Sequence, residues 1–379
     1  MKILQISTGL GGGGAEKITA LLAEGLKAGG HEVIVLSLLP QPETPGIPQR
    51  LERAGIEVRY LNAAKSDPCL LWKLRRAIRE IAPDLVHSHL MHPNLLSRLA
   101  CAGLGIPVVN TIHTAEKRRR KGMYFLLDRL TRRLAWSVTA VSRAAAAFHE
   151  KACGFPPGSI HVIRNAVEPV IPAPAELCTE LLKLWAPEGA DKIIGSIGRL
   201  DAMKGYELLL DRLEPLSRII PPNAKWLILI LGDGPDREKL ERKAAALRLE
   251  NLRVVFAGFR ADAAPLMNLF DVFLSTSLCE GYGLAAAEAM TLGLPLVCNG
   301  TDAIPELCRA YNGDSFLFDM TEDTEGEDMA LKLLSASECA RSAGQCISSP
   351  EKMIRSYLVL YQVLLKKRKK PFDKTGKRR

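Results

Sequence analysis

Short apolar runs alternate with longer amphipathic stretches along nearly the whole chain, and this alternation limits the possible folds more than any other feature. The short runs are rich in Val, Ile and Leu and apolar throughout, which is typical of parallel strands buried on both faces. Strands that alternate with helices in this way form doubly wound sheets. The sequence therefore predicts an α/β protein with parallel sheets covered by helices.

One interruption of the pattern predicts two domains. Residues 168–175 contain three prolines, which extend neither a helix nor a central strand. The 379 residues also have the length of two domains at about 150 residues each. We expect strands at 2–7, 32–38, 56–61, 84–88, 107–112, 137–141 and 161–163, and then at 193–197, 226–231, 252–256, 272–275, 295–298 and 315–318. We expect a first domain at 1–170, a linker at 171–185, a second domain at 186–348, a helix at 351–366 that packs back on the first domain, and a basic tail at 366–379.

The net charge of +9 is concentrated in that tail. Residues 366–379 hold nine basic residues and one acid, so the tail carries +8 and the rest of the chain sums to +1. A nearly neutral body with a cationic tail favours contact with an anionic membrane surface over specific nucleic-acid binding. The basic run 117–121 leads into an amphipathic stretch at 122–134, which is either a second membrane-docking element or an ordinary helix with its apolar face in the core.

Other features bear on the location of the protein. No apolar run reaches the ~18 residues that span a bilayer, and the first residues read as a strand and not as a signal peptide. The nine cysteines are scattered and form no Cys-x-x-Cys pair, which favours reduced thiols. We expect a cytoplasmic protein, peripheral on the inner face of the cytoplasmic membrane.

A glycine-rich loop follows the first strand. Gly9, Gly11 and Gly14 match a dinucleotide-binding fingerprint, but the second strand ends without the acidic residue that binds a ribose, which disfavours a nicotinamide cofactor. Backbone N–H groups at a helix N-terminus still suit a phosphate or a sugar. The alternative is a tight turn without a ligand.

The second half contains a group of charged residues suited to a sugar diphosphate. Arg199 follows the first strand of the second domain and Lys204 starts the next helix, so both lie at the carboxyl edge of the sheet. Glu280 and Glu288 flank a glycine-containing turn and a small-residue helix. The cations suit phosphates and the carboxylates suit hydroxyl groups. The alternative is that Glu280 only initiates the helix and Glu288 lies on the surface.

With Gly198-Arg199-Leu200, Lys204-Gly205 and the Glu-x7-Glu of 280–288, the chain resembles the retaining glycosyltransferases of family 4, which have the GT-B fold of two Rossmann-like domains facing a central cleft. The resemblance covers nearly the whole chain. Further matching segments are 11–16, 87–89, 111–113, 141–142, 162–167, 231–234 and 256–258. The chain departs from the family at Asn165-Ala166-Val167-Glu168, where Ala166 replaces a common glycine.

This resemblance implies roles for particular residues. Arg199 and Lys204 would neutralise the donor diphosphate, Glu280 would hold the transferred sugar, and Glu288 would hold the ribose. His113 would face the reacting sugar, although a structural histidine is an equal alternative. The remaining residues that the resemblance assigns to donor binding are Gly13, Gly14, Gly258, Gly281, Tyr282, Gly283 and Leu284.

The resemblance also implies front-face attack, in which the leaving diphosphate takes the proton of the acceptor and preorganised donors stabilise charge. The chain contains no Asp-x-Asp, so we expect neither a catalytic metal nor another cofactor. A metal at His87, His89 and His92 is a minor alternative. The expected reaction moves a hexose or N-acetylhexosamine from a nucleotide sugar, UDP-linked, to a lipid-linked or envelope polysaccharide acceptor. The alternatives are a UDP-N-acetylglucosamine 2-epimerase and a non-catalytic nucleotide or nucleic-acid binder.

Overall fold

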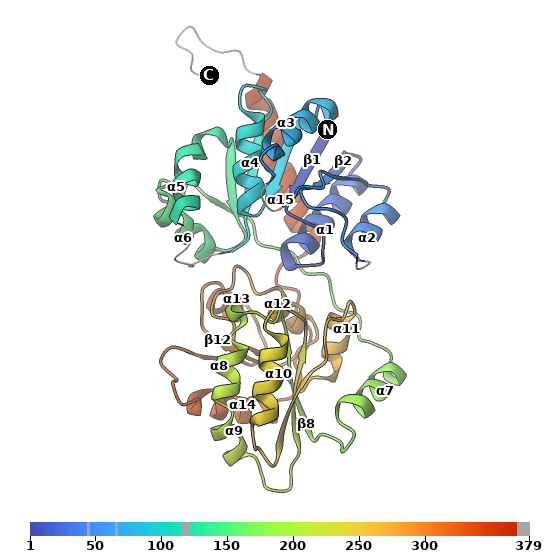
Figure 1. The fold of residues 1–379 in the computed structure, drawn as a ribbon, viewed down its shortest axis with the longest axis vertical. Helices are drawn as coiled ribbons and strands as arrows, with labels where there is room; N and C mark the ends of the chain where they lie inside the picture. The colour runs from blue at the N-terminus through green and yellow to red at the C-terminus, as the bar shows by residue number, and fades with distance from the viewer. Residues whose placement is uncertain (44–45, 65–66, 115–121, 370–379) are drawn as a thin grey trace. The chain divides into compact units, whose positions relative to one another are not determined.

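The computed structural model describes residues 1–43, 46–64, 67–114 and 122–369 (Figure 1). The described chain forms two compact units. Unit 1 comprises Met1–Ala166 and the segment that begins at Ser348, and unit 2 comprises Val167–Ile347. Each unit is built on one parallel sheet, which confirms the α/β architecture predicted from the alternating pattern.

Unit 1 contains a seven-stranded sheet in the order β3-β2-β1-β4-β5-β6-β7. Its winding reverses between β1 and β4, and parallel sheets bind ligands at such a reversal, beyond the carboxyl ends of the strands. The strands are β1 (Lys2–Ser7), β2 (Glu32–Ser37), β3 (Glu57–Tyr60), β4 (Leu85–His89), β5 (Val108–Ile112), β6 (Ser137–Ala140) and β7 (His161–Val162). All pair in parallel.

The helices of unit 1 form two contacting groups, as expected for a sheet covered on both faces: α1 contacts α2 and α15, and α4 contacts α3 and α5. Their bounds are α1 (Gly14–Ala28), α2 (Ile47–Arg53), α3 (Leu70–Ile81), α4 (Met91–Cys101), α5 (Gly122–Thr131), the short 3-10 helix η2 (Arg132–Leu134), α6 (Arg143–Cys153) and α15 (Pro350–Lys369). Across the described residues, no helix combines the length and the apolar character needed to cross a membrane.

Helix α15 joins the far end of the chain to unit 1. The Tyr361 hydroxyl lies 2.6 Å from Nδ1 of His87 on β4, and the Tyr357 hydroxyl lies 3.1 Å from Oγ1 of Thr111 on β5. On α1, a Cβ at Gly25 would come within 2.0 Å of Ile354, so glycine is required for the two helices to pack this closely. The buried tyrosines tie α15 to the middle of the sheet.

Unit 2 contains a six-stranded parallel sheet in the order β10-β9-β8-β11-β12-β13. Strand β9, which lies between β10 and β8, is buried at every residue, which explains its unbroken apolar sequence. The strands are β8 (Lys192–Ile197), β9 (Trp226–Leu231), β10 (Leu252–Phe256), β11 (Val272–Ser275), β12 (Leu296–Asn299) and β13 (Ser315–Phe318). The helices are α7 (Ala175–Trp185), η3 (Ala202–Lys204), α8 (Tyr206–Asp211), α9 (Glu214–Ile219), α10 (Arg237–Ala246), α11 (Ala263–Leu266), η4 (Met267–Leu269), α12 (Leu284–Thr291), α13 (Ile304–Cys308) and α14 (Glu327–Glu338).

The expected linker at 171–185 differs from the structure, in which most of it is helix α7 within unit 2. The prolines end at Pro174, and the eleven residues that follow form a helix that buries Cys178 and Trp185. Unit 2 also begins earlier than residue 186. The backbone N–H of Val170 donates to Oγ1 of Thr291 at 3.1 Å, and that of Ala173 donates to the Pro265 carbonyl, so the proline-rich stretch is attached to unit 2.

Candidate active site

The loop after β8 carries the first two predicted donor residues and is held by tight backbone packing. Leu200 is buried, and its N–H donates to the Asp233 carbonyl at 3.0 Å. A Cβ at Gly232 would come within 1.9 Å of the Gly198 carbonyl, and one at Gly234 within 2.3 Å of the Leu200 carbonyl. The glycines after β9 therefore let its loop lie directly against the loop that presents Arg199.

Lys204 is fixed by a second close approach. Gly205 has a φ of +70°, and a Cβ there would lie 2.2 Å from the Thr276 carbonyl oxygen, so this position requires glycine. The Thr276 hydroxyl donates to the Lys204 carbonyl at 2.7 Å, and the Leu278 N–H donates to the Met203 carbonyl at 2.8 Å. The loop after β11 thus positions the backbone of Lys204.

The same two loops bring Lys204 and Glu280 into an ion pair. Lys204 Nζ donates to Glu280 Oε2 at 2.7 Å, and both side chains are largely buried. Burial alone lowers the pKa of Lys204, but the charge of Glu280 and the hydrogen bond to it outweigh burial and raise the pKa above its ordinary value. Lys204 is therefore a cation at neutral pH.

Arg199, in contrast, is exposed, and its Nε lies 3.9 Å from Oδ2 of Asp201. At that distance the contact is a weak surface ion pair, worth at most about 1 kcal/mol. The guanidinium is therefore free to turn toward an anion at the carboxyl edge of the sheet.

The turn between Glu280 and α12 contains the remaining predicted residues of unit 2. The Glu280 N–H donates to Oδ2 of Asp302 at 3.1 Å, which fixes the start of the turn. Gly283 is the N-cap of α12, with a φ of +88°, and a Cβ there would lie 2.8 Å from Ile304. Gly281 and Tyr282 are buried, whereas Leu284 and Glu288 are half-buried on α12. Glu280 thus precedes the glycine turn at the N-terminus of α12, and Glu288 follows it within the helix.

Gly258 lies two residues after the end of β10. Its carbonyl accepts from the Gly232 N–H at 2.8 Å, and it has a φ of +77°. A Cβ there would lie 3.1 Å from Arg237, which is held by Asp233 and Glu241. The predicted donor residues of unit 2 thus follow β8, β10 and β11, and β9 lies between β10 and β8 in the sheet. All of them lie beyond the carboxyl ends of parallel strands, where such sheets bind ligands.

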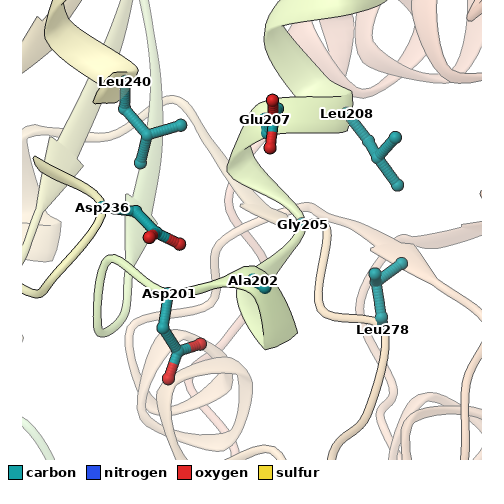
Figure 2. A pocket seen from close by; sticks show the side chains of 8 residues that line it. All are labelled: Asp201, Ala202, Gly205, Glu207, Leu208, Asp236, Leu240 and Leu278. Atoms are coloured by element: carbon teal, nitrogen blue, oxygen red, sulfur yellow. The ribbon is translucent and has the colours of Figure 1, made fainter.

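A pocket of about 220 Å³ opens beside η3 and the start of α8 (Figure 2). Its lining contains three carboxylates but no basic side chain, which does not suit a diphosphate. The lining residues are Asp201, Ala202, Gly205, Glu207, Leu208, Asp236, Leu240 and Leu278. Arg199, Lys204 and Glu280 do not line this pocket, so the predicted donor residues and the pocket are separate features.

In unit 1, the glycine loop leads into α1, and a carboxylate of that helix accepts a hydrogen bond from the loop. Gly13 is the N-cap of α1, and its N–H donates to Glu16 Oε2 at 2.8 Å. Gly13 and Gly14 are exposed, as a ligand-binding loop requires. The Glu16 carboxylate, however, accepts from the N–H group of Gly13, a residue that the family resemblance assigns to contact with the donor phosphate. The glycine pattern alone does not predict this interaction, but a glutamate three residues after an N-cap is its typical signal.

His113 follows β5 and is buried with two other histidines. Its Nε2 lies 3.0 Å from Nδ1 of His89, and the His89 ring lies 4.1 Å from that of His87. Burial lowers the pKa of His113 to about 4, and burial together with the His113 charge lowers that of His87 to about 3. His113 is therefore uncharged at neutral pH and acts through hydrogen bonds.

The alternative of a metal at His87, His89 and His92 does not fit this arrangement. Both ring nitrogens of His87 are hydrogen-bonded to hydroxyl groups, those of Tyr361 and Thr111, each at 2.6 Å. His92 is exposed and lies 3.0 Å from the Tyr124 hydroxyl. The three histidines are thus engaged by different partners and do not form one ligand set.

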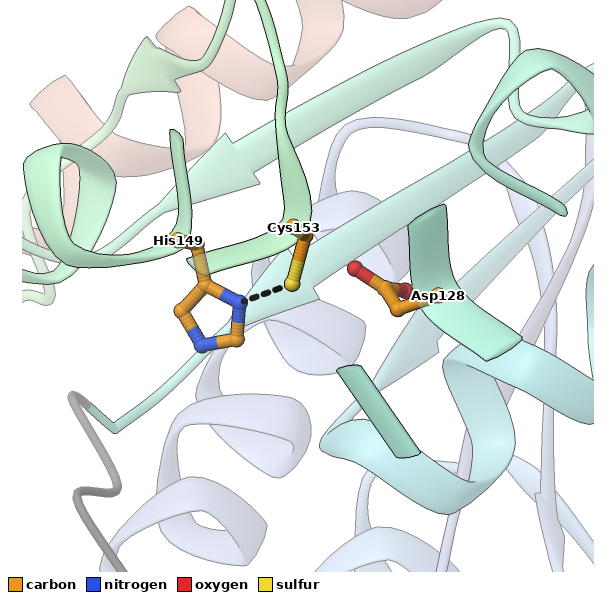
Figure 3. Close-up of side chains that lie close together, drawn as sticks. All are labelled: Asp128, His149 and Cys153. Atoms are coloured by element: carbon orange, nitrogen blue, oxygen red, sulfur yellow. Dashed lines mark hydrogen bonds between the residues drawn. The ribbon is translucent and has the colours of Figure 1, made fainter. Parts of the chain in front are cut away.

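A different group of metal-ligating types, Asp128, His149 and Cys153, lies between α5 and α6 (Figure 3). Cys153 Sγ lies 3.7 Å from Nδ1 of His149. The Asp128 carboxylate already accepts from the buried Arg98, and Arg132 donates to the Cys153 carbonyl. Burial and the charge of Asp128 raise the pKa of the Cys153 thiol. Two neighbouring guanidinium groups disfavour a further cation, so this cluster is a structural network.

Both units match known protein families. Residues 12–170 match the model of Glycosyltransferase Family 4, and residues 191–336 match that of Glycosyl transferases group 1. The chain belongs to the family 4 glycosyltransferases. This glycosyltransferase is 25% identical to the N-acetyl-alpha-D-glucosaminyl L-malate synthase of Bacillus anthracis, with 96% of each chain covered. It is 27% identical to a GDP-mannose-dependent alpha-(1-6)-phosphatidylinositol dimannoside mannosyltransferase of Mycobacterium tuberculosis, with 83% of each covered.

Solved structures agree on the fold of the glycosyltransferase. HepE of Anabaena, solved with UDP and glucose, has a TM-score of 0.77 at 21% identity, with 96% of this chain and 99% of HepE covered. This similarity supports the GT-B fold that the sequence motifs implied. The family assignment makes the protein a transferase.

Proposed function

We propose that the glycosyltransferase moves a hexose or N-acetylhexosamine from a UDP-sugar, with retention of the anomeric configuration. The observation that carries the proposal is the Lys204–Glu280 pair, which places a cation beside a carboxylate at the carboxyl edge of the unit 2 sheet. Such a pair offers charge to a phosphate and an acceptor oxygen to a sugar hydroxyl. HepE, solved with UDP and glucose, supports UDP, and the GDP-mannose-dependent relative makes GDP the competing nucleotide.

In the proposed reaction, the bond from the anomeric carbon to the phosphate oxygen breaks while the acceptor oxygen bonds to the same face. The leaving diphosphate accepts the acceptor proton. Arg199 and Lys204 stabilise the charge that develops on the diphosphate, and preorganised groups of this kind contribute about 3–4 kcal/mol each. Glu280 holds hydroxyls of the transferred sugar, and Glu288 holds the ribose. Because two cations serve the diphosphate, we propose that no metal is required.

Other residues complete the proposed donor site. The backbone of Gly281–Leu284 binds the sugar and phosphate of the donor at the N-terminus of α12, where the helix dipole favours an anion. Gly258 lies just after β10 at the same edge of the sheet. In unit 1, Gly13, Gly14 and the neutral His113 are the proposed contacts to phosphate and sugar.

The proposed acceptor is a lipid-linked or envelope polysaccharide, and the proposed location is peripheral on the inner face of the cytoplasmic membrane. The relative that mannosylates a phosphatidylinositol dimannoside supports a lipid acceptor. The basic tail at 366–379 supports attraction to anionic lipid, although residues 370–379 lie outside the described part of the chain.

The test compares donors and then disables the site. Thermal unfolding is followed with UDP-glucose, UDP-N-acetylglucosamine and GDP-mannose, because a bound donor stabilises the folded state by mass action. Arg199→Ala and Lys204→Ala should each remove most of the stabilisation by the preferred donor and reduce transfer about 100-fold or more. Lys225→Ala, at an exposed lysine of the same unit, is the control and should change neither. Full transfer by the Lys204 variant would refute the donor site, and loss of transfer in EDTA would refute the metal-free reaction.

A further inference from the structure

Helix α5 and the short helix η2 present a continuous apolar surface to solvent. Met123, Leu126, Leu130 and Leu134 follow one another at intervals of three or four residues, so they lie on one helix face. They are 66%, 49%, 69% and 40% exposed, respectively. We call these four side chains the α5 ridge. Exposed leucines are ordinary singly, but a row of four at helical spacing marks an interaction surface.

The opposite side of α5 shows that the ridge does not result from loose packing. Asp128 is the buried residue of this helix, and its carboxylate accepts a hydrogen bond from the fully buried Arg98 of α4. Phe125 packs against Phe148 and His149 of α6, with ring centroids 5.9 and 6.0 Å apart. A surface helix ordinarily buries its leucines and exposes its acid. Here a specific buried ion pair anchors the helix in the reverse orientation.

The sequence left open whether the apolar side chains of 122–134 lie in the core. The structure answers this for the ridge, because all four side chains are exposed. The helix is attached to unit 1 through Asp128 and Phe125 instead.

The charges beside the ridge indicate what covers it. Arg129 and Arg133 are exposed, and Arg132 is half-buried, donating to the Cys153 carbonyl. The one acid of this segment, Asp128, is already neutralised by Arg98. Within residues 122–134, the ridge is therefore flanked by cations alone. A second copy of the same face would bring like charges together, whereas an anionic bilayer offers both phosphates and an apolar interior.

We propose that the α5 ridge inserts into the surface of an anionic lipid bilayer, with Arg129 and Arg133 at the level of the phosphates. The benefit of this contact rests on the proposed function, since an enzyme bound to the membrane reaches a lipid-linked acceptor directly. Lipid binding itself needs neither donor nor acceptor.

The test measures binding of the full chain to vesicles of phosphatidylcholine and phosphatidylglycerol by sedimentation. Leu126→Glu/Leu130→Glu should weaken partitioning at least about tenfold, because it removes two inserting leucines and adds two repelling charges. The matched control is Leu184→Glu/Leu331→Glu, which makes the same change at leucines of unit 2 that are 71% and 58% exposed. The control should lose no more than about twofold through its added charge.

A second variant tests insertion directly. Brominated lipid should quench the tryptophan fluorescence of Leu130→Trp more strongly than that of the wild-type chain. Such a difference would show that this position enters the bilayer. Equal partitioning of the wild type and Leu126→Glu/Leu130→Glu would overturn the proposal, as would absence of wild-type binding. Lipid-free dimerisation that the same substitutions abolish would also overturn it, in favour of a second copy. UDP-induced thermal stabilisation of each variant keeps these outcomes separate from a failure of the proposed function.

Discussion

Lys204 Nζ lies 2.7 Å from Oε2 of Glu280, although the two residues are 76 positions apart in the chain. The contact exists because Gly205 lets the loop after β8 touch the loop after β11. It gives the candidate site a cation–carboxylate pair without net charge. A diphosphate that binds Lys204 would compete with Glu280 and release its carboxylate for a sugar hydroxyl.

The first prediction concerns this competition. In Glu280→Gln the lysine loses its charged partner, so UDP should bind as tightly as before or more tightly. Transfer should still fall about 100-fold, because the variant lacks the carboxylate that orients the sugar. Calorimetry with UDP and turnover with the preferred donor measure the two effects. Glu188→Gln, at the exposed partner of Lys225, should leave both unchanged. Weaker UDP binding with normal turnover would contradict the competition.

The second prediction concerns the close approach at Gly205. Gly205→Ala places a Cβ 2.2 Å from the Thr276 carbonyl and also strains a positive φ. Gly189 has a φ of +80°, and no described atom lies within 4 Å of the position that a Cβ would take there, so Gly189→Ala isolates the cost of the φ angle. We expect Gly189→Ala to lower the free energy of unfolding by about 1 kcal/mol. Gly205→Ala should lower it by about 1–3 kcal/mol more and reduce transfer. Urea titration measures the difference, and equal costs would show that the two loops can separate freely.

The third prediction concerns Glu16. Its carboxylate caps α1 by accepting from the Gly13 N–H, so Glu16→Gln should lower the free energy of unfolding by up to about 1 kcal/mol. If the glycine loop takes a donor phosphate, removing this negative charge should also strengthen UDP binding. Glu32→Gln, at an exposed residue of the same unit, is the control for net charge. Unchanged UDP affinity in Glu16→Gln would argue against a phosphate at this loop.

The fourth prediction follows from the buried histidines. Burial lowers the pKa of His113 to about 4 and that of His87 to about 3, against an ordinary 6.5. Below about pH 6.5 the unfolded chain therefore binds protons that the folded chain does not, and stability falls toward pH 4 by up to about 1.4 kcal/mol per pH unit for each histidine. Urea titration between about pH 7 and about pH 5 should show this slope. His113→Gln should reduce the slope by about the contribution of one histidine, whereas His161→Gln, at an exposed position, should leave the slope unchanged. A slope unaffected by His113→Gln would mean that His113 ionises freely in the folded state.

The strands were predictable to within one or two residues because burial on both faces of a parallel sheet leaves an unbroken apolar run, as in β9. The position of Lys204 and Glu280 at adjacent strand ends followed from the same topology. The contact between Glu280 and Asp302 was not predictable from spacing, since it depends on how two loops fold over the sheet edge.

The orientation of α5 was also not predictable from the sequence. The sequence pattern at 122–134 allows either of two helix faces to be buried. Which face is buried depends on Arg98, which lies 30 residues from Asp128 in the chain. Helix α7 was missed for a different reason, because the prolines before it dominated the local signal. Its burial of Cys178 and Trp185 depends on unit 2 as a whole.

The attachment of α15 has a consequence for synthesis on the ribosome. Tyr357 and Tyr361 contribute hydroxyl groups to the interior of a sheet whose strands are translated first. Until residues 350–369 have left the exit tunnel, His87 and Thr111 lack those partners and α1 lacks its neighbour. We therefore expect unit 2, which is contiguous in the chain, to reach its native state before unit 1, so that the part of the protein made first is completed last.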